Sequence, residues 1–312
     1  MGKKILVLGS SNVDFVFKIP KFHHPGETIL AEGQATFFGG KGANQAIAAK
    51  RLGGDVCFIT KVGNDLYGKS YRQHLIKNGL ERRLILKDRK LSTGMAMIEL
   101  TPEGENRIVS FPGANGSLSV NDLLRLQSRW RGVGVFVTQL EIPLRTVEKG
   151  VRLAKAQGSL ILLNPSPPAQ LSPHFFSSVD FIVPNEIEAQ SLTGMKWKGD
   201  RDIRKMAERL LELGVKNVVI TLGPKGLLFK NRSEEFWMKA FKVNAVDTTA
   251  AGDAFLGALA AGLSENKPIH EALWFANGAG ALATTKLGAQ PSLPFRKDLE
   301  VFLSKTNLQS EC

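Results

Sequence analysis

Short runs of apolar residues, many of them β-branched, recur along the chain, and each is long enough for one strand buried on both faces. These runs cover residues 5–8, 56–62, 133–138, 160–163, 181–183 and 218–222. Apolar residues at three- and four-residue steps, the spacing of a helix face, cover 144–157, 203–213 and 269–286, while 43–52 is Ala-rich and 254–263 is small and apolar. Strands that alternate with helices predict an α/β fold with a doubly wound, mostly parallel sheet between two layers of helices.

Two regions break this rhythm. Residues 14–38 and 92–113 alternate apolar and polar positions more nearly with period two, and each contains a turn signal, at Pro25-Gly26 and at Pro102-Glu103-Gly104. We expect hairpins that join into a small, discontinuous second sheet and serve as a lid over a cleft. The chain from 1 to 312 is otherwise expected to form a single domain.

Composition narrows the class of protein. Of the 312 residues, 43% are hydrophobic and 22% are charged, the balance of a globular protein in solution. No segment approaches the roughly 20 apolar residues that cross a bilayer, so a membrane is not expected as a partner. Cys57 and Cys312 lie far apart in the sequence and fit a reduced, cytoplasmic setting.

The formal net charge of +12 raises the question of a polyanionic partner. Lys and Arg are scattered along the chain rather than gathered in runs, which disfavours a nucleic acid. A nucleotide substrate would gain from the same positive field. The charge therefore fits a small anionic substrate better than a polymer.

The most informative segment reads DTTAAGD from Asp247 to Asp253 and leads into the apolar stretch 254–263. A glycine and an acid at the first turn of a helix bring unpaired backbone N–H groups and the positive end of the helix dipole around one carboxylate. Such a place can hold a transferring phosphoryl group. Asp253, kept ionised by the helix end, can accept the proton of an attacking hydroxyl. Taken alone, the segment fits an ordinary helix cap equally well.

A glycine-rich segment, GGKGANQ from Gly39 to Gln45, precedes the Ala-rich helix. It is not a P-loop, because that motif requires Ser or Thr after the lysine and here Gly42 follows Lys41. Its glycines allow a small ligand to approach the backbone closely, and Asn44 offers both a donor and an acceptor. The alternative is a tight turn before a helix.

Three polar residues stand near strand ends. Asn12 and Asp14 are two positions apart and leave a strand extension by the same face, where together they suit the neighbouring hydroxyls of a sugar. Glu141 follows the apolar run 133–138 and can accept from another side. Each residue taken singly also fits an exposed polar position. Doubly wound folds open their binding crevice at strand ends, which favours a shared ligand site.

Two further segments suit a nucleotide and its metal ion. The acids of NEIE, from Asn185 to Glu188, follow a predicted strand and can hold Mg²⁺ directly or through water, although a helix start favours acids too. The turn from Thr221 to Gly226 can cradle phosphate or ribose, although turns of this kind are common. Neither a Ser-His-Asp hydrolase pattern nor a GxSxG motif is present, so hydrolysis has no support.

Taken together, these segments resemble, in order, those of the ribokinase members of the PfkB carbohydrate kinase family. The similar segments are 39–44, 184–188, 221–226, 247–253 and 288–292, and the resemblance runs from about Lys4 to Leu303. It implies a ribokinase-like three-layer α/β/α fold. One departure is Ala250, where the wider family often has glycine.

For catalysis, the resemblance implies that Asp253 is the base toward the primary hydroxyl of a sugar. An anion hole for the γ-phosphoryl group of ATP would be formed by the backbone N–H groups of Ala250, Ala251, Gly252 and Asp253. The sugar would be held at the positions of Asn12, Asp14, Gly40, Lys41, Asn44 and Glu141.

The resemblance also implies sites for the nucleotide and for cations. Nucleotide contacts would come from Asn185, Thr221, Gly223, Gly226, Gly252 and Asn277. Glu188 belongs to a motif linked to Mg²⁺ and phosphate. A monovalent cation, usually K⁺, would lie beside the anion hole at Asp247 and Ser292 and at the carbonyls of Thr249, Ala283, Lys286 and Gly288.

The expected function is therefore ATP-dependent phosphorylation of D-ribose at its 5-hydroxyl, in a homodimer that pairs through the lid. A related sugar or nucleoside kinase, such as a deoxyribokinase, is the alternative within the same class. A non-catalytic sugar or nucleic-acid binding protein is the alternative from another class.

Overall fold

The computed structural model describes residues 2–310 and is built around a nine-stranded sheet. Its strands are β1 (Lys4–Leu8), β4 (Val56–Gly63), β5 (Ile85–Asp88), β8 (Val133–Thr138), β9 (Leu160–Leu163), β10 (Phe181–Ile182), β11 (Asn217–Thr221), β12 (Leu227–Lys230) and β13 (Glu235–Met238). They lie in the order β13-β12-β11-β10-β9-β8-β1-β4-β5. All neighbours from β11 to β5 are parallel, whereas β12 and β13 add an antiparallel hairpin at one edge.

Successive side chains of a strand point to opposite faces of this sheet, and both faces are apolar, so helices cover both. On β1, Ile5 and Val7 enter one core layer, and Leu6 and Leu8 enter the other. The first layer packs against α1 (Lys41–Arg51), α2 (Leu66–Lys77), α8 (Ala251–Ser264), α9 (Ile269–Ala283) and α11 (Arg296–Ser310). The second packs against α3 (Val120–Leu126), α4 (Leu144–Ala156), α5 (Pro173–Phe176), α6 (Glu186–Thr193) and α7 (Asp200–Glu212). The predicted three-layer α/β/α fold class is confirmed.

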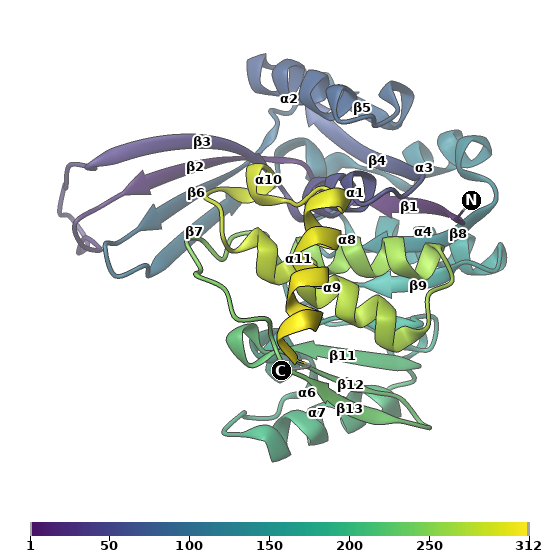
Figure 1. Cartoon of the computed structure of the whole chain (residues 1–312). Coiled ribbons are helices and arrows are strands. Elements are labelled where there is room, and N and C mark those ends of the chain that lie inside the picture. Colours follow the sequence, from purple (N-terminus) through teal and green to yellow (C-terminus); the bar gives the residue numbers. More distant parts are fainter. Residues whose placement is uncertain (1, 311–312) are drawn as a thin grey trace.

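A separate four-stranded sheet projects from the main body (Figure 1). Its strands are β2 (Asn12–Lys18), β3 (Gly33–Gly39), β6 (Gly94–Leu100) and β7 (Asn106–Phe111), in the order β3-β2-β6-β7. The antiparallel pairs β2–β3 and β6–β7 meet where β2 runs parallel to β6. Since β3 leads through Gly40 into α1, the second sheet joins the main body beside the glycine-rich segment. Its action as a lid, and the single domain, stay predictions.

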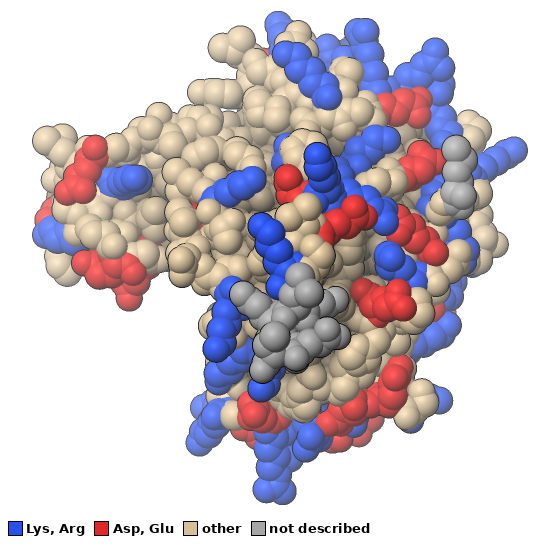
Figure 2. Space-filling model, viewed as in Figure 1, with Lys and Arg blue, Asp and Glu red and all other residues tan. Residues whose placement is uncertain are grey.

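The surface charge is mixed. Figure 2 shows Lys and Arg spread over the visible face and interspersed with Asp and Glu, as their scatter in the sequence predicts. Within the part of the chain that the structure describes, no helix is both long and apolar enough to cross a membrane.

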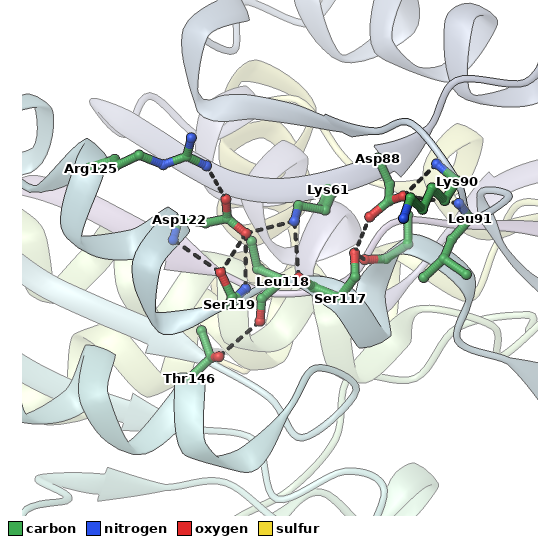
Figure 3. A network of polar contacts seen from close by, with 11 residues as sticks. Lys61, Asp88, Lys90, Leu91, Ser117, Leu118, Ser119, Asp122, Arg125 and Thr146 are labelled. Atoms are coloured by element: carbon green, nitrogen blue, oxygen red, sulfur yellow. Dashed lines mark hydrogen bonds and ion pairs between the residues drawn. The ribbon is translucent and has the colours of Figure 1, made fainter.

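A buried ion pair fixes the chain where it returns from the second sheet to the main body. Lys61 on β4 reaches Asp122 on α3, with 2.6 Å between Nζ and Oδ2, and also donates to the Ser117 carbonyl over 3.0 Å (Figure 3). Asp122 completes a capping box with Ser119, and Arg125 pairs with its other oxygen. Burial raises the pKa of Asp122, but the hydrogen bonds from Lys61 and Ser119 outweigh burial and hold that pKa below its usual value. The pair therefore anchors the segment that follows β7 to the central sheet.

We expect Asp122→Ala to lower the free energy of unfolding by about 3–5 kcal/mol, because it leaves the Lys61 ammonium buried without a counter-charge. The double variant Lys61→Met/Asp122→Ala removes both charges and should be more stable than the single variant. Urea unfolding followed by tryptophan fluorescence measures both. A double variant less stable than Asp122→Ala would show that the ion pair is not the anchor.

Candidate active site

Asp253 lies in the first turn of α8 and is only 8% exposed. Two side-chain amides of α1 hold its carboxylate: Asn44 Nδ2 donates to Oδ2 and Gln45 Nε2 donates to Oδ1, each over 2.9 Å. A buried carboxylate requires such donors, because burial of an unpaired charge is strongly unfavourable. Asp253 therefore joins the start of α8 to the start of α1.

Glycines let α1 approach both α8 and β1 closely. A Cβ at Gly257 would lie 2.5 Å from the Ala48 Cβ and 2.8 Å from the Gln45 carbonyl oxygen. A Cβ at Gly42 would lie 2.5 Å from the backbone nitrogen of Ser10. A side chain at either position would push α1 away, and with it the amides that reach Asp253.

The start of α8 offers free backbone donors. Ala250 precedes the helix with a φ of 61°, in the left-handed region that residues other than glycine rarely adopt. The Ala251 N–H donates to the Thr248 carbonyl over 3.2 Å, whereas no residue among 2–310 accepts the N–H of Gly252 or Asp253. A Cβ on Gly252 would meet nothing within 4 Å, so this turn faces open space. The helix start therefore suits an anion, although the Ala251 amide is already occupied.

Asp253 and Lys41 form the electrostatic centre of the site. Burial raises the pKa of Asp253, and it outweighs Lys41 and the two amides, which favour the ionised form. The helix end alone would have predicted the opposite direction, but burial is the stronger effect. Burial acts to lower the pKa of Lys41, yet surrounding carboxylates raise that pKa above its usual value. These carboxylates belong, in order of effect, to Asp253, Glu141, Glu188 and Asp14.

Asp14 on β2 lies over the end of β3. A Cβ at Gly39 would lie only 1.9 Å from Asp14 Oδ2, so the glycine makes room for this carboxylate. Burial raises the pKa of Asp14 to about 7, and the charges of Glu141 and Asp253 add to the rise. Asp14 therefore titrates near neutral pH.

The other residues expected to hold a sugar surround the glycine-rich segment. Asn12 on β2 is buried and accepts from Asn115 Nδ2 over 2.7 Å. Glu141, beyond the end of β8, accepts from the Ser10 hydroxyl and, over 3.2 Å, from the Lys41 backbone N–H. Gly40 turns the chain into α1 with a φ of 87°, and a Cβ there would lie 2.6 Å from the Asn12 backbone nitrogen. Asn44 keeps a buried Oδ1 for which the described residues 2–310 provide no donor.

Two cavities share Thr248 as a lining residue, and Asp253 lines the smaller of them. The smaller, of about 220 Å³, is lined by Asp253 together with Lys41, Asn164, Val183, Asn185, Glu188, Thr221, Thr248, Ala250, Gly252 and Leu256. The larger, of about 590 Å³, lies between the second sheet and the segments 245–249 and 287–289, with Asp14 in its wall. The two adjoin, because Thr248 lines both.

The residues expected to contact a nucleotide fall into two groups. Asn185 and Glu188 line the smaller cavity, as Thr221 does, and also form a reciprocal capping box at the start of α6, over 2.8 and 2.9 Å. The helix start that the sequence offered as an alternative is thus present together with the cavity. Asn277 on α9 is buried, its Nδ2 donates to the Lys239 carbonyl over 2.8 Å, and it lines neither of the two cavities.

Gly223 and Gly226 belong to the turn that follows β11. Both have positive φ, 53° and 101° respectively. Gly226 has no room for a side chain, because a Cβ would lie 1.9 Å from the Met238 carbonyl oxygen. Gly223 has open space around it, which leaves its backbone accessible to a ligand.

Asp247 joins the segment before α8 to the loop after α9. Its Oδ1 accepts the Thr249 N–H and its Oδ2 accepts the Gly288 N–H, each over 2.8 Å. Two of the expected carbonyls flank this connection: Ala283 ends α9, and Lys286 lies in the loop that leads into α10 (Ala289–Ser292). Within α10, Ser292 is buried and donates its hydroxyl to the Ala289 carbonyl over 2.7 Å. The structure thus brings Asp247, Thr249 and Gly288 into contact.

Sequence reasoning missed several amides of the site. Gln45 and Gln139 form a chain to Asp253, Asn164 lines the smaller cavity, and Asn115 holds Asn12. Gln139 and Asn164 each follow a buried strand directly, the same signal that identified Glu141, so they were within reach of the sequence. Asn115 comes from a turn far along the chain and has no such signal.

Comparison with known proteins agrees with this geometry. The model of the pfkB family carbohydrate kinases matches residues 2–296. A ribokinase of Haemophilus influenzae is 39% identical over 97% of this chain and 99% of its own length. A deoxyribokinase of Salmonella typhi is 36% identical over 96% of this chain and 98% of its own. The structure of an Arabidopsis thaliana ribokinase complexed with ribose and ATP superposes with a TM-score of 0.88 at 31% identity, over 97% of this chain and 99% of that one.

A family match over nearly the whole chain, with the acid, the lysine and the open amides in one cavity, leaves a single assignment. This chain belongs to the pfkB family of carbohydrate kinases.

Proposed function

We propose that this protein transfers the γ-phosphoryl group of ATP to the primary 5-hydroxyl of D-ribose and releases D-ribose 5-phosphate and ADP. The observation that carries the proposal is the smaller cavity, where a carboxylate, a lysine and the open start of a helix converge on one space. The Arabidopsis ribokinase complexed with ribose and ATP, and the ribokinase of Haemophilus influenzae, support both substrates.

The sugar would lie against the second sheet, with its 5-hydroxyl toward Asp253. Asp14 in the wall of the larger cavity supplies a carboxylate that can accept from two neighbouring hydroxyls. Asn12, on the same face of β2, and Glu141, from beyond β8, would add further acceptors. The Oδ1 of Asn44, for which the described part of the chain provides no donor, would supply a further acceptor, while the Nδ2 of the same side chain holds Asp253. Asn44 would thereby connect the sugar to the base.

Phosphoryl transfer follows from this placement. The 5-oxygen forms a bond to the γ-phosphorus, the bond from that phosphorus to the bridging oxygen breaks, ADP takes the electron pair, and Asp253 takes the hydroxyl proton. Such transfer passes through a loose transition state, so that positioning and charge stabilisation do most of the work and the proton moves late. The raised pKa of Asp253 suits a late proton acceptor better than an ordinary aspartate would. The open amides at the start of α8 would stabilise the charge on the transferring group.

We further propose that the reaction uses Mg²⁺ and a monovalent cation such as K⁺. Several carboxylates around a single lysine leave surplus negative charge where the phosphates would arrive, and bound Mg²⁺ would neutralise charge on those phosphates. Glu188 would hold Mg²⁺ through water, a mode that hard cations often prefer. The monovalent ion would be held by Asp247 and Ser292 and by the carbonyls of Thr249, Ala283, Lys286 and Gly288, and it would stiffen the anion site.

A homodimer that pairs through the second sheet is also proposed, with a cytoplasmic location. The support is the apolar surface that one face of this sheet leaves exposed at Met97, Val109 and Phe111. Patches of this kind mark contacts between proteins more often than free surface.

A deoxyribokinase is the second candidate, supported by the Salmonella relative, and the two activities differ in the sugar 2-hydroxyl. A site built to bond a hydroxyl rejects an analogue that lacks it, because its buried polar groups are left unpaired. We therefore expect kcat/KM for D-ribose to exceed that for 2-deoxy-D-ribose by at least about tenfold. A coupled assay of ADP release over pentoses and hexoses, with Mg²⁺ and with or without K⁺, measures this. A preference for 2-deoxyribose would favour the second candidate, and no sugar-dependent ADP release would remove both.

Asp253→Asn is expected to lower kcat by roughly 10²- to 10⁴-fold and to leave the Kd for ribose within about threefold, because the amide cannot accept the proton. Single-turnover phosphorylation and calorimetric titration of ribose measure the two quantities. Wild-type turnover in this variant would refute the role of Asp253.

The pH dependence of sugar binding should follow Asp14. Its pKa of about 7 means that it becomes protonated as pH falls through neutrality, and it then loses acceptor capacity toward the sugar. If only the ionised form binds, KM for ribose should rise about tenfold between pH 8 and pH 6. Asp14→Asn, which cannot titrate, serves as the control and should show a higher and flat KM. A flat KM in the wild-type protein would contradict this account.

A further inference from the structure

A chain of side-chain amides, two of them fully buried, holds the Asp253 carboxylate and extends to Asn164 in the lining of the smaller cavity. Gln45 is 1% exposed and donates to Asp253 Oδ1 over 2.9 Å. Its own oxygen accepts from Nε2 of Gln139, which follows β8 and is fully buried. The Nε2 of Gln45 also donates to Asn164 Oδ1 over 3.3 Å, and the Asn164 side-chain amide donates in turn to the Val183 carbonyl over 3.2 Å.

The direction of this chain follows from the carboxylate. An ionised carboxylate only accepts hydrogen bonds, so Gln45 must present its NH₂ group to Asp253 and turn its oxygen away. That oxygen then needs a donor, and the Gln139 NH₂ group provides it. Each amide is therefore fixed in one of its two orientations by its neighbour.

Gln139 fits beside β1 only because Gly9 has no side chain, and its Oε1 is buried there. A Cβ on Gly9 would lie only 2.0 Å from Gln139 Oε1, so Gln139 fits because Gly9 follows β1. That Oε1 is buried, and no residue among 2–310 donates to it. A buried acceptor without a donor is destabilising, and such departures from good packing are typical of functional positions.

We propose that Gln45 is a positioning residue for the Asp253 carboxylate and that Gln139 holds Gln45 in its donating orientation. The NH₂ group of Gln45 donates to Asp253 and Asn164 and its oxygen accepts from Gln139, so Gln45 acts through Asp253 and not on the substrate. With Gln45 on one oxygen and Asn44 on the other, the carboxylate cannot rotate, and its remaining lone pairs stay aimed at the cavity. The inference rests on the proposed role of Asp253 as the base.

The electrostatics of the site support this role. Burial raises the pKa of Asp253, and the hydrogen bond from Gln45 opposes that rise. The charged groups that face Asp253 from neighbouring elements are Lys41 on α1, Glu141 after β8 and Asp14 on β2. These charged groups remain when Gln45 is replaced. A change in the pKa of Asp253 therefore reports on the loss of the Gln45 amide itself.

The direct test measures the protonation of Asp253 without any substrate. Carbon-13 NMR of protein labelled at the aspartate carboxyl carbons follows the Asp253 signal, assigned by its absence in Asp253→Asn. In Gln45→Met, which keeps the bulk but cannot donate, the pKa of Asp253 should rise. Gln139→Met should raise the pKa of Asp253 too, but by less. This second variant still tests the proposal if Gln45→Met does not fold. Unchanged titration in both variants overturns the proposal, whichever sugar the protein phosphorylates.

The kinetic test separates positioning from a loss of stability. Gln45→Met should lower kcat about tenfold or more, because a hydrogen bond to a charged group is lost, with KM for sugar and ATP within about threefold. The acid limb of its kcat profile should move to higher pH. Ser159→Ala is the matched control: Ser159 is buried before β9 and its hydroxyl donates to the Val133 carbonyl over 2.7 Å, so the variant loses a buried bond but should keep the wild-type profile. If Gln45→Met and Ser159→Ala lose kcat equally and neither pH profile of kcat moves, Gln45 is only a structural residue. If the wild-type protein is inactive but the predicted NMR shift is seen, the result counts against the proposed function alone.

Discussion

A buried carboxylate at the start of α8 is tolerated only because α1 brings two amides to it. Each oxygen of Asp253 accepts one side-chain N–H of α1, so the first turns of the two helices are held in a fixed relation. This contact depends in turn on glycines, since any side chain at Gly257 or Gly42 would separate α1 from its neighbours. The same helix start leaves backbone N–H groups open toward the small cavity. One contact therefore positions both the proposed base and the proposed anion site.

The position of the site follows from the sheet. Parallel strands end at a common edge, and polar residues directly after those strands gather there. Glu141 and Gln139 follow β8, Asn164 follows β9, and all three lie near α1 or the cavity it borders. The second sheet adds Asp14 from another direction, which gathers several carboxylates around Lys41. The raised pKa values of Asp14 and Asp253 both follow from this crowding of acids in a buried place.

Much of this arrangement is readable in the sequence, because local periodicity and tertiary structure agree. The apolar runs at 133–138 and 160–163 coincide with β8 and β9, and the stretch expected to follow Asp253 is α8. The antiparallel hairpin β12–β13 and the helices α2 and α11 were not predicted. The apolar run of β12 is only three residues long, Leu227 to Phe229, although it enters both core layers. The contact between Asp247 and Gly288 was expected from the resemblance, and no local pattern predicted it.

The sequence does not show how burial and nearby charges together set the pKa of Asp253. The helix dipole predicts an ionised Asp253, yet burial dominates and raises the pKa, and burial is set by α1, which lies far away in the chain. The amide chain through Gln45 and Gln139 is hidden for the same reason, because its members meet only after α1 has packed on β1, β4 and α8. Such contacts between distant segments decide the chemistry of the site.

The most direct measurement of the central claim is a crystal structure with D-ribose, ADP, Mg²⁺ and aluminium fluoride, which imitates the transferring phosphoryl group. The account predicts the ribose 5-oxygen within hydrogen-bond distance of the Asp253 carboxylate and the fluoride ligands at the backbone N–H groups that begin α8. A ribose 5-oxygen turned away from Asp253, or a fluoride group bound elsewhere, would contradict it.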